Sequence, residues 1–109
     1  MIAKKFTFVS AAAEREFYDL PLKIRERFAL DLAAIAMGSK PFCSFESLKT
    51  VGPGVIELKK NGSPAYRCVY VAKYNGTVYV LHSFTKTTNG VDRKAMSTIA
   101  SRYSKIPKD

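Results

Sequence analysis

The sequence has few of the residues that build metal sites or disulfide scaffolds. It has one histidine, His82, and two cysteines, Cys43 and Cys68, which form no Cys-x-x-Cys motif. Two distant cysteines and a single histidine make a poor ligand set for zinc, so we expect no bound metal and no other cofactor. We expect both cysteines to be reduced thiols, as is usual in the cytoplasm.

Long apolar runs are also missing. No run approaches the roughly 20 residues of a membrane-spanning helix. The N-terminal segment MIAKKFTFVS lacks the apolar stretch of a secretory signal. We therefore expect a cytoplasmic protein with no membrane partner. The 109 residues are enough for one modest core, which predicts a single domain over residues 1–109.

Acidic residues are scarce compared with basic ones. Nine Asp and Glu face 18 Lys and Arg, which gives a net charge of +9. Residues 1–50 carry eight basic and six acidic residues (+2), whereas residues 51–109 carry ten and three (+7). This bias favours a polyanionic partner, either nucleic acid or an acidic protein segment, over a neutral small molecule. A solvated basic surface would have the same composition.

The order of predicted elements indicates an α+β fold. We expect a strand over 5–9, helices over 11–20 and 22–37, a loop over 38–54, strands over 55–60, 65–74 and 77–84, a turn at 88–90 and a last helix. Asp92 is the expected N-cap of the last helix, and Asp31 falls off the apolar stripe of the second. The predicted architecture is an N-terminal helical hairpin packed on a small, mostly antiparallel sheet, followed by a C-terminal helix.

The Asn75-Gly76 pair predicts a type I′ turn between two strands, because that turn needs positive φ at both central residues. The turn fixes the expected pairs as Tyr74–Thr77, Tyr70–Leu81, Val69–His82 and Arg67–Phe84. Alternation then places Arg67, Val69 and Val71 on one face with Val80, His82 and Phe84.

This register makes Arg67 and His82 diagonal neighbours on that face, near the strand end from which Lys86 departs. The looser Asn61-Gly62 turn leaves open whether Lys59 or Lys60 joins the same face; Glu57 goes with Lys59.

A cluster of Lys, Arg and one His suits cleavage of RNA by the neighbouring 2′-hydroxyl. In that reaction the substrate supplies the nucleophile, and the protein positions it and stabilises negative charge in the transition state. His82, or a lysine of depressed pKa, is the candidate for proton transfer. The other interpretation is that His82 is a core histidine whose hydrogen bonds are made within the protein and that has no catalytic role. For Arg67, in an otherwise apolar strand, we favour a functional role.

Three segments, GVIELK (54–59), YRCVY (66–70) and LHSFTK (81–86), resemble the successive strand motifs of the RelE/ParE toxin superfamily, most closely its HigB-like, phage-derived branch. The resemblance covers nearly the whole chain, up to Arg102. It implies the toxin of a type II toxin–antitoxin pair, typically a ribosome-dependent endoribonuclease that cuts translated mRNA without a metal. Its partners would be mRNA on the ribosome and a cognate antitoxin that covers the basic face.

The resemblance also implies roles for single residues. Arg67 follows the motif tyrosine, and Lys86 is the first of a usual Lys-Lys pair, which implies phosphate and transition-state roles for both. Lys59 stands where the branch usually has Arg, which implies phosphate binding. His82 would take part in proton transfer.

Two positions depart from the branch. Thr87 replaces the second Lys, and Val91-Asp92 replaces a common Thr-Pro. Lys60 or Arg93 would then supply the missing RNA-binding cation. Two alternatives remain: a ParE-like toxin that inhibits DNA gyrase without cutting RNA, and an inactive relative that only binds its antitoxin. Clustering of Arg67, His82 and Lys86 around one concave patch would favour the nuclease.

Overall fold

The computed structural model describes residues 3–87 and 89–108, and over these ranges it contains three helices and one five-stranded sheet. The elements in chain order are β1 (Lys5–Phe8), α1 (Ala11–Tyr18), α2 (Leu22–Ala36), β2 (Ser44–Ser47), β3 (Val55–Lys60), β4 (Ala65–Val71), β5 (Thr77–Lys86) and α3 (Arg93–Ser104). The strand order is β1-β5-β4-β3-β2; β1 runs parallel to β5 and every other pair is antiparallel. The predicted α+β class is confirmed.

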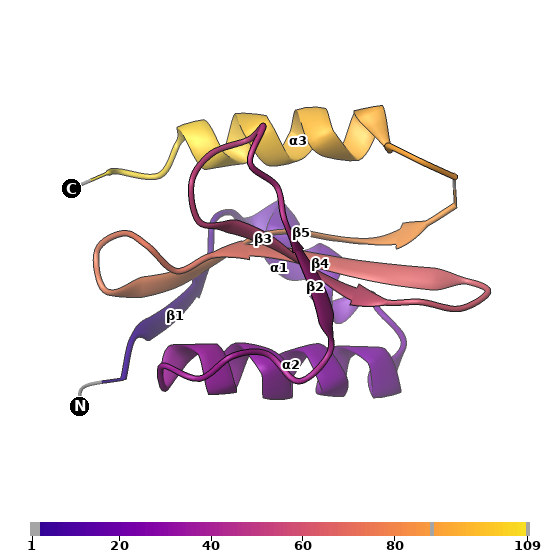
Figure 1. Cartoon of the computed structure of the whole chain (residues 1–109), viewed down its shortest axis with the longest axis horizontal. Helices are drawn as coiled ribbons and strands as arrows, with labels where there is room; N and C mark the ends of the chain where they lie inside the picture. Colours follow the sequence, from indigo (N-terminus) through magenta and orange to yellow (C-terminus); the bar gives the residue numbers. More distant parts are fainter. Residues whose placement is uncertain (1–2, 88, 109) are drawn as a thin grey trace.

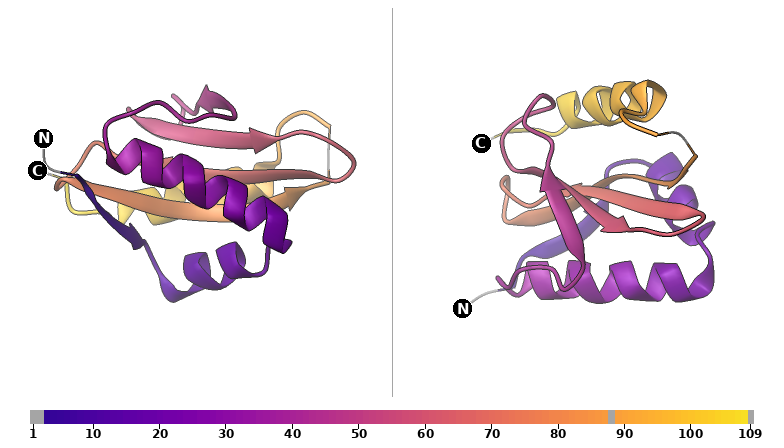
Figure 2. Two further views of the ribbon diagram at one scale, coloured as in Figure 1. Left: turned by 90° about the horizontal axis from the view of Figure 1, so that it is seen from below. Right: turned by 45° about the vertical axis from the view of Figure 1, so that its right-hand side comes forward.

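The sheet lies between two layers of helix, with α2 on one side and α3 on the other (Figure 1). One core joins α1 and α2 to the sheet, and the large side chains at its centre are Phe28, Leu32 and Leu58. The second core joins α3 to the opposite face through Ile99, Tyr103 and strand residues such as Val69. In Figure 2 α2 and α3 remain on opposite sides of the sheet when the molecule is turned, and α1 lies beside the edge of the sheet. Among the described residues no helix is long and apolar enough to cross a membrane.

The turn between β4 and β5 has the predicted conformation. Asn75 and Gly76 both have φ of 58°, and the Thr77 amide donates to the Tyr74 carbonyl at 3.1 Å. The pairs nearest the predicted site, Arg67–Phe84 and Val69–His82, are also confirmed.

The predicted pair Tyr70–Leu81 is wrong, because Tyr70 lies opposite Val80. A β-bulge shifts the register between Val69 and Tyr70 and leaves Leu81 as the extra residue of β5. Val80 therefore joins the core under α1 and α2, and Leu81 takes the expected place of Val80 in the core under α3. β4 also ends at Val71, three residues earlier than predicted.

The segment 38–54, expected to be a loop, contains the edge strand β2, which pairs with β3. All four residues of β2 are exposed, so no alternation of apolar and polar residues marks it in the sequence. The predicted turn at 88–90 includes Thr88, which lies outside the described residues. The Asp92 side chain accepts from the Ala95 amide at 3.0 Å, which confirms the predicted N-cap of α3.

Asp31 differs most from its expected place, because the residue is only 1% exposed. Its Oδ1 atom accepts hydrogen bonds from the amides of Phe42 (2.7 Å) and Cys43 (3.3 Å), just before β2 begins. The Asp31 carboxylate therefore links α2 to residues 42–43, which lead into the edge strand β2. A side chain off the apolar stripe of a helix can still be buried when a loop covers it.

The Asp31→Ala substitution should destabilise the fold by roughly 2–4 kcal/mol, because it leaves two amides without their charged acceptor. Urea unfolding followed by circular dichroism would measure this. Asp31→Asn is the matched control, since its amide oxygen can still accept from both groups. Equal stability of Asp31→Ala and the wild type would show that this anchor contributes nothing.

Candidate nucleic-acid interface

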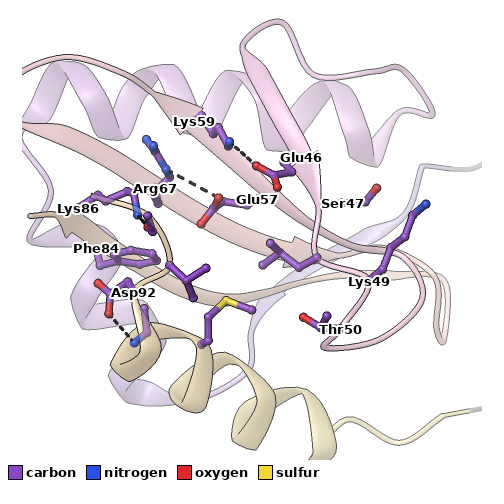
Figure 3. A pocket seen from close by; sticks show the side chains of 15 residues that line it. Glu46, Ser47, Lys49, Thr50, Glu57, Lys59, Arg67, Phe84, Lys86 and Asp92 are labelled. Carbon is purple, nitrogen blue, oxygen red and sulfur yellow. Dashed lines mark hydrogen bonds and ion pairs between the residues drawn. The ribbon is translucent and has the colours of Figure 1, made fainter. Parts of the chain in front are cut away.

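A groove of about 770 Å³ lies on the α3 side of the sheet. Its walls are the segment 46–50, the facing side chains of β3, β4 and β5, and the start of α3, as Figure 3 shows. The volume falls within the range of about 300–1,000 Å³ that is typical of ligand-binding pockets. The register of the three strands brings Lys59, Arg67 and Lys86 to this groove from three different strands.

Arg67 lies in the floor of the groove, and its side chain is 7% exposed. One of its donors is used: Nη1 donates to the Tyr66 carbonyl at 3.0 Å. The Nε atom lies 3.8 Å from Oε1 of Glu57, which is too long for a hydrogen bond, and has no hydrogen-bond partner among the described residues. Arg67 therefore presents a buried, positively charged fork with unused donors, a group that suits a carboxylate or phosphate.

Lys49, Lys59 and Lys86 also line the groove, and Lys59 and Lys86 each contact an oxygen. Lys59 forms an ion pair with Glu46 of β2, and Lys86 donates to the carbonyl of Gly90. The hydrogen bond from Lys59 and its charge lower the pKa of Glu46 below its ordinary value. Both contacts are on the solvent side of the groove, where an incoming anion can exchange with them at small cost.

Glu57 stands beside Arg67 on β3, with a side chain that is 14% exposed. Burial raises the pKa of Glu57 above its ordinary value of 4.5, although the positive charges of Arg67 and Lys59 act in the opposite direction. The groove thus holds a carboxyl group with increased proton affinity next to a buried guanidinium. Sequence reasoning placed Glu57 on the face of Lys59 and gave it no role.

A second pocket adjoins the groove on the far side of Arg67 and Lys86, and these two residues line both. Its other walls are the β3–β4 turn and the chain after β5, including Thr87. The position where the superfamily branch usually has its second Lys therefore faces the same space as Arg67. Together the two pockets form a continuous surface that passes over Arg67 and Lys86.

His82 does not line the groove. It lies in a neighbouring pocket of about 310 Å³ that shares Phe84, Asp92 and Ala95 with it. The His82 ring stacks on Phe84, with centroids 4.8 Å apart.

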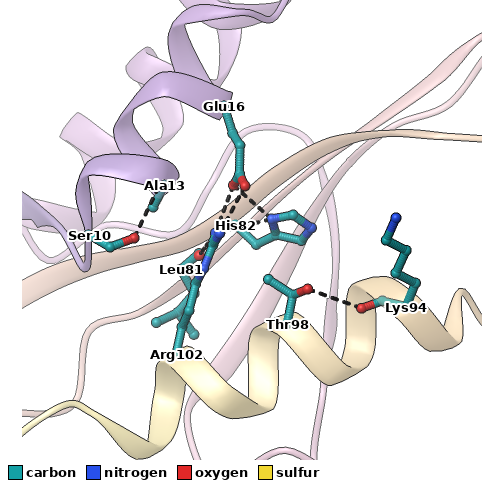
Figure 4. Close-up of polar contacts among 8 residues, drawn as sticks. All are labelled: Ser10, Ala13, Glu16, Leu81, His82, Lys94, Thr98 and Arg102. Carbon is teal, nitrogen blue, oxygen red and sulfur yellow. Dashed lines mark hydrogen bonds and ion pairs between the residues drawn. The ribbon is translucent and has the colours of Figure 1, made fainter.

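Figure 4 shows that the Nδ1 atom of His82 faces Glu16 of α1, at 2.8 Å from Oε1. Arg102 of α3 joins the same carboxylate through two hydrogen bonds of 2.7 and 2.9 Å and also donates to the Leu81 carbonyl. Burial opposes the charge on Glu16, but the hydrogen bonds and charges of Arg102 and His82 outweigh it and lower the pKa of Glu16. The three side chains therefore tie α1, β5 and α3 together.

Lys60 and Arg93 are also outside the groove lining. Lys60 pairs with Tyr66 and alternates with Lys59, so it is on the face covered by α1 and α2. Arg93 is exposed at the first position of α3. The structure therefore gathers Lys59, Arg67 and Lys86 at one place and leaves the other three predicted site residues elsewhere.

Both cysteines are free thiols in the part of the chain that the structure describes. Burial raises the pKa of Cys43 to about 11 and that of Cys68 to about 12, so neither is a reactive thiolate near neutral pH. No group of three or more potential metal ligands occurs among the described residues.

The Glu16→Gln substitution should lower the free energy of unfolding by about 1–2 kcal/mol near neutral pH, because it weakens the hydrogen bonds of the Glu16 carboxylate with Arg102 and His82. The pKa of Glu16 is lower in the folded state, so its stabilisation is present above the ordinary value of 4.5 and is lost as the pH falls below it. Urea unfolding from about pH 7 to about pH 3 should show the wild type and the variant converging. The exposed neighbour Glu14 provides the control variant Glu14→Gln; a constant difference across the range would contradict the assignment.

Comparison with known proteins identifies the family. Residues 15–104 match the profile of the family described as phage derived protein Gp49-like (DUF891). A search of curated proteins found no match. Among solved structures, the crystal structure of the toxin–antitoxin complex RelBE2 from Mycobacterium tuberculosis is similar, with 19% identity, a TM-score of 0.49, and coverage of 81% of this chain and 97% of that chain. The chain belongs to the phage-derived Gp49-like family, which confirms the predicted phage-derived branch.

Proposed function

We propose that this protein is the toxin of a type II toxin–antitoxin system and that it cleaves translated mRNA in the groove around Arg67. One observation carries the proposal: a buried guanidinium with unused donors lies between Lys59 and Lys86 in an open groove. Family membership supports the toxin assignment. Net charge of +9 agrees with a polyanionic substrate.

In this proposal the scissile phosphate binds between Arg67 and Lys86. The planar fork of Arg67 donates to the non-bridging oxygens, and its burial makes each hydrogen bond stronger than it would be in water. Arg67 is fixed before the substrate arrives, so it can stabilise the extra charge of the five-coordinate phosphorus without reorganising. Lys59 holds a flanking phosphate after exchanging Glu46 for it.

The proposed protein partner is an antitoxin that covers the same groove. An acidic segment would pair with Arg67 and Lys86 and exclude the mRNA. Glu46 and Glu57 partly neutralise Lys59 and Arg67, so the electrostatic attraction that the groove exerts on free RNA is moderate. This agrees with a nuclease whose substrate is positioned by the ribosome.

The location of His82 bears on the choice between nuclease and gyrase inhibitor. Of the three residues whose clustering was expected for a nuclease, Arg67 and Lys86 share one concave site, whereas His82 is held by Glu16 in the next pocket. We therefore assign transition-state stabilisation to Arg67 and Lys86 and give His82 a structural role.

The Arg67→Ala variant should lose cleavage by roughly two to three orders of magnitude, as expected when a donor to the transition state is removed. The measurement is induced expression in bacteria, with primer extension on a translated mRNA. Lys60→Ala is the control variant. It also removes one positive charge from the β3–β4 hairpin, but Lys60 is on the face of the sheet opposite to Lys59 and Arg67. It should cut like the wild type.

Thermal unfolding of each purified variant should confirm that it is folded, and Lys86→Ala serves as a second test if Arg67→Ala unfolds. Full cleavage by folded Arg67→Ala would overturn the proposed site. Growth arrest by the wild type without any cuts would indicate a gyrase-type toxin. Neither arrest nor cuts would indicate an inactive antitoxin-binding relative.

A further inference from the structure

Glu57 is a half-buried carboxylate in the wall of the groove. Its side chain is 14% exposed, whereas that of Glu46 is 57% exposed and paired with Lys59. The third carboxylate of the lining, Asp92, caps α3. Glu57 faces Arg67 from the neighbouring strand without a hydrogen bond between them, since their closest charged atoms are 3.8 Å apart. In Figure 3 its carboxylate points into the groove between Arg67 and the segment that carries Glu46.

We propose that Glu57 is the general base that takes the proton from the attacking 2′-hydroxyl of the RNA. The inference rests on the proposed nuclease function and adds a catalytic residue to it. A phosphate bound to the unused donors of Arg67 would place the adjacent ribose within reach of Glu57, because both side chains project from neighbouring strands into one groove.

The chemical step balances with these groups. The 2′-oxygen gives its proton to Glu57 and forms a bond to phosphorus, while the bond from phosphorus to the 5′-oxygen breaks. The leaving 5′-oxygen takes a proton from water, and Glu57 later returns its proton to water. The products are a 2′,3′-cyclic phosphate and a 5′-hydroxyl end.

The other candidates for this role are less well placed. Lys59 and Lys86 serve as bases only after losing a proton, and each donates to an oxygen in the structure. His82 uses Nδ1 for Glu16 in the neighbouring pocket. Glu57 is an acceptor in its ionised form, and its ion pair with Arg67, at 3.8 Å, leaves its carboxylate without a hydrogen bond among the groups that the structure describes.

The surroundings of Glu57 also give it suitable proton affinity. The charged groups that face it are Arg67 and Lys59, with Glu46 and Lys86 further out. Burial outweighs the two facing cations and raises the pKa of Glu57, which makes the carboxylate a stronger base than one in water. Cleavage should therefore increase as the pH rises through this pKa and reach a plateau above it.

The test is the pH dependence of cleavage under single-turnover conditions, with ribosome-bound mRNA and excess toxin. We expect Glu57→Gln to lower the plateau rate by roughly 100- to 1,000-fold and to abolish the acidic limb of the profile. Glu57→Asp should retain the limb at a reduced rate. Binding of an uncleavable RNA with 2′-deoxyribose at the cut site should change less than threefold in Glu57→Gln, as Gln preserves the shape beside Arg67.

The Glu46→Gln variant is the matched control, because it removes a carboxylate from the same groove. It should keep the acidic limb. If Glu57→Gln keeps the limb and a near wild-type rate, or if Glu46→Gln loses it instead, Glu57 is not the base while the nuclease function stands. If Glu57→Gln weakens binding as much as cleavage, Glu57 only positions Arg67. If the wild type cuts no mRNA, the proposed function and this inference fail together.

Discussion

The pairing register of β3, β4 and β5 is the constraint on which both the fold and the groove depend. Because side chains alternate across a sheet, one choice of register decides which residues enter each core. It sends Leu58 and Cys68 under α1 and α2, and it sends Val69 under α3. Lys59 and Arg67 lie directly opposite each other in that register, on the α3 side. A slip of one residue would turn the cations toward α1 and α2 and the core side chains toward the groove.

The polar residues on the α3 side of the sheet differ in how many of their hydrogen-bonding groups have partners. Glu16, His82 and Arg102 form a closed network between α1, β5 and α3, with short hydrogen bonds at each contact. Arg67, by contrast, is buried beside the half-buried Glu57 without a hydrogen bond between them. Leaving a buried donor unpaired costs free energy, so such a pair is better explained by a ligand that completes it than by stability.

The sequence alone predicted those parts of the molecule that are determined by local signals. The Asn75-Gly76 turn located the hairpin, and the expected pairs Val69–His82 and Arg67–Phe84 are present although Tyr70 between them and the turn pairs one residue off. The periodicity of the helices identified their buried faces. It did not predict β2, because an edge strand with four exposed residues has no alternation to detect. It also placed Val80 on the wrong face, because a bulge at Leu81 is a tertiary adjustment.

The candidate site was predictable to a similar extent. Lys59, Arg67 and Lys86 meet because they occupy equivalent faces of neighbouring strands. The sequence did not reveal the acidic neighbours of these cations. Glu46, which pairs with Lys59, comes from the edge strand β2 that was not predicted, and the raised pKa of Glu57 depends on its burial in the folded structure. His82 lies on the predicted face, but its ring contacts Glu16, which is 66 residues away in the chain, and so it does not line the groove.

The central claim, that the groove cleaves RNA through the substrate's own 2′-hydroxyl, is tested most directly with one pair of mRNAs. One mRNA has ribose and the other a single 2′-deoxyribose at the cut nucleotide; both are bound to ribosomes and incubated with the wild-type toxin. Attack by the 2′-hydroxyl would give 2′,3′-cyclic phosphate and 5′-hydroxyl ends from the first mRNA and no cut at that position in the second. Equal cleavage of both mRNAs, or 5′-phosphate ends, would contradict the claim.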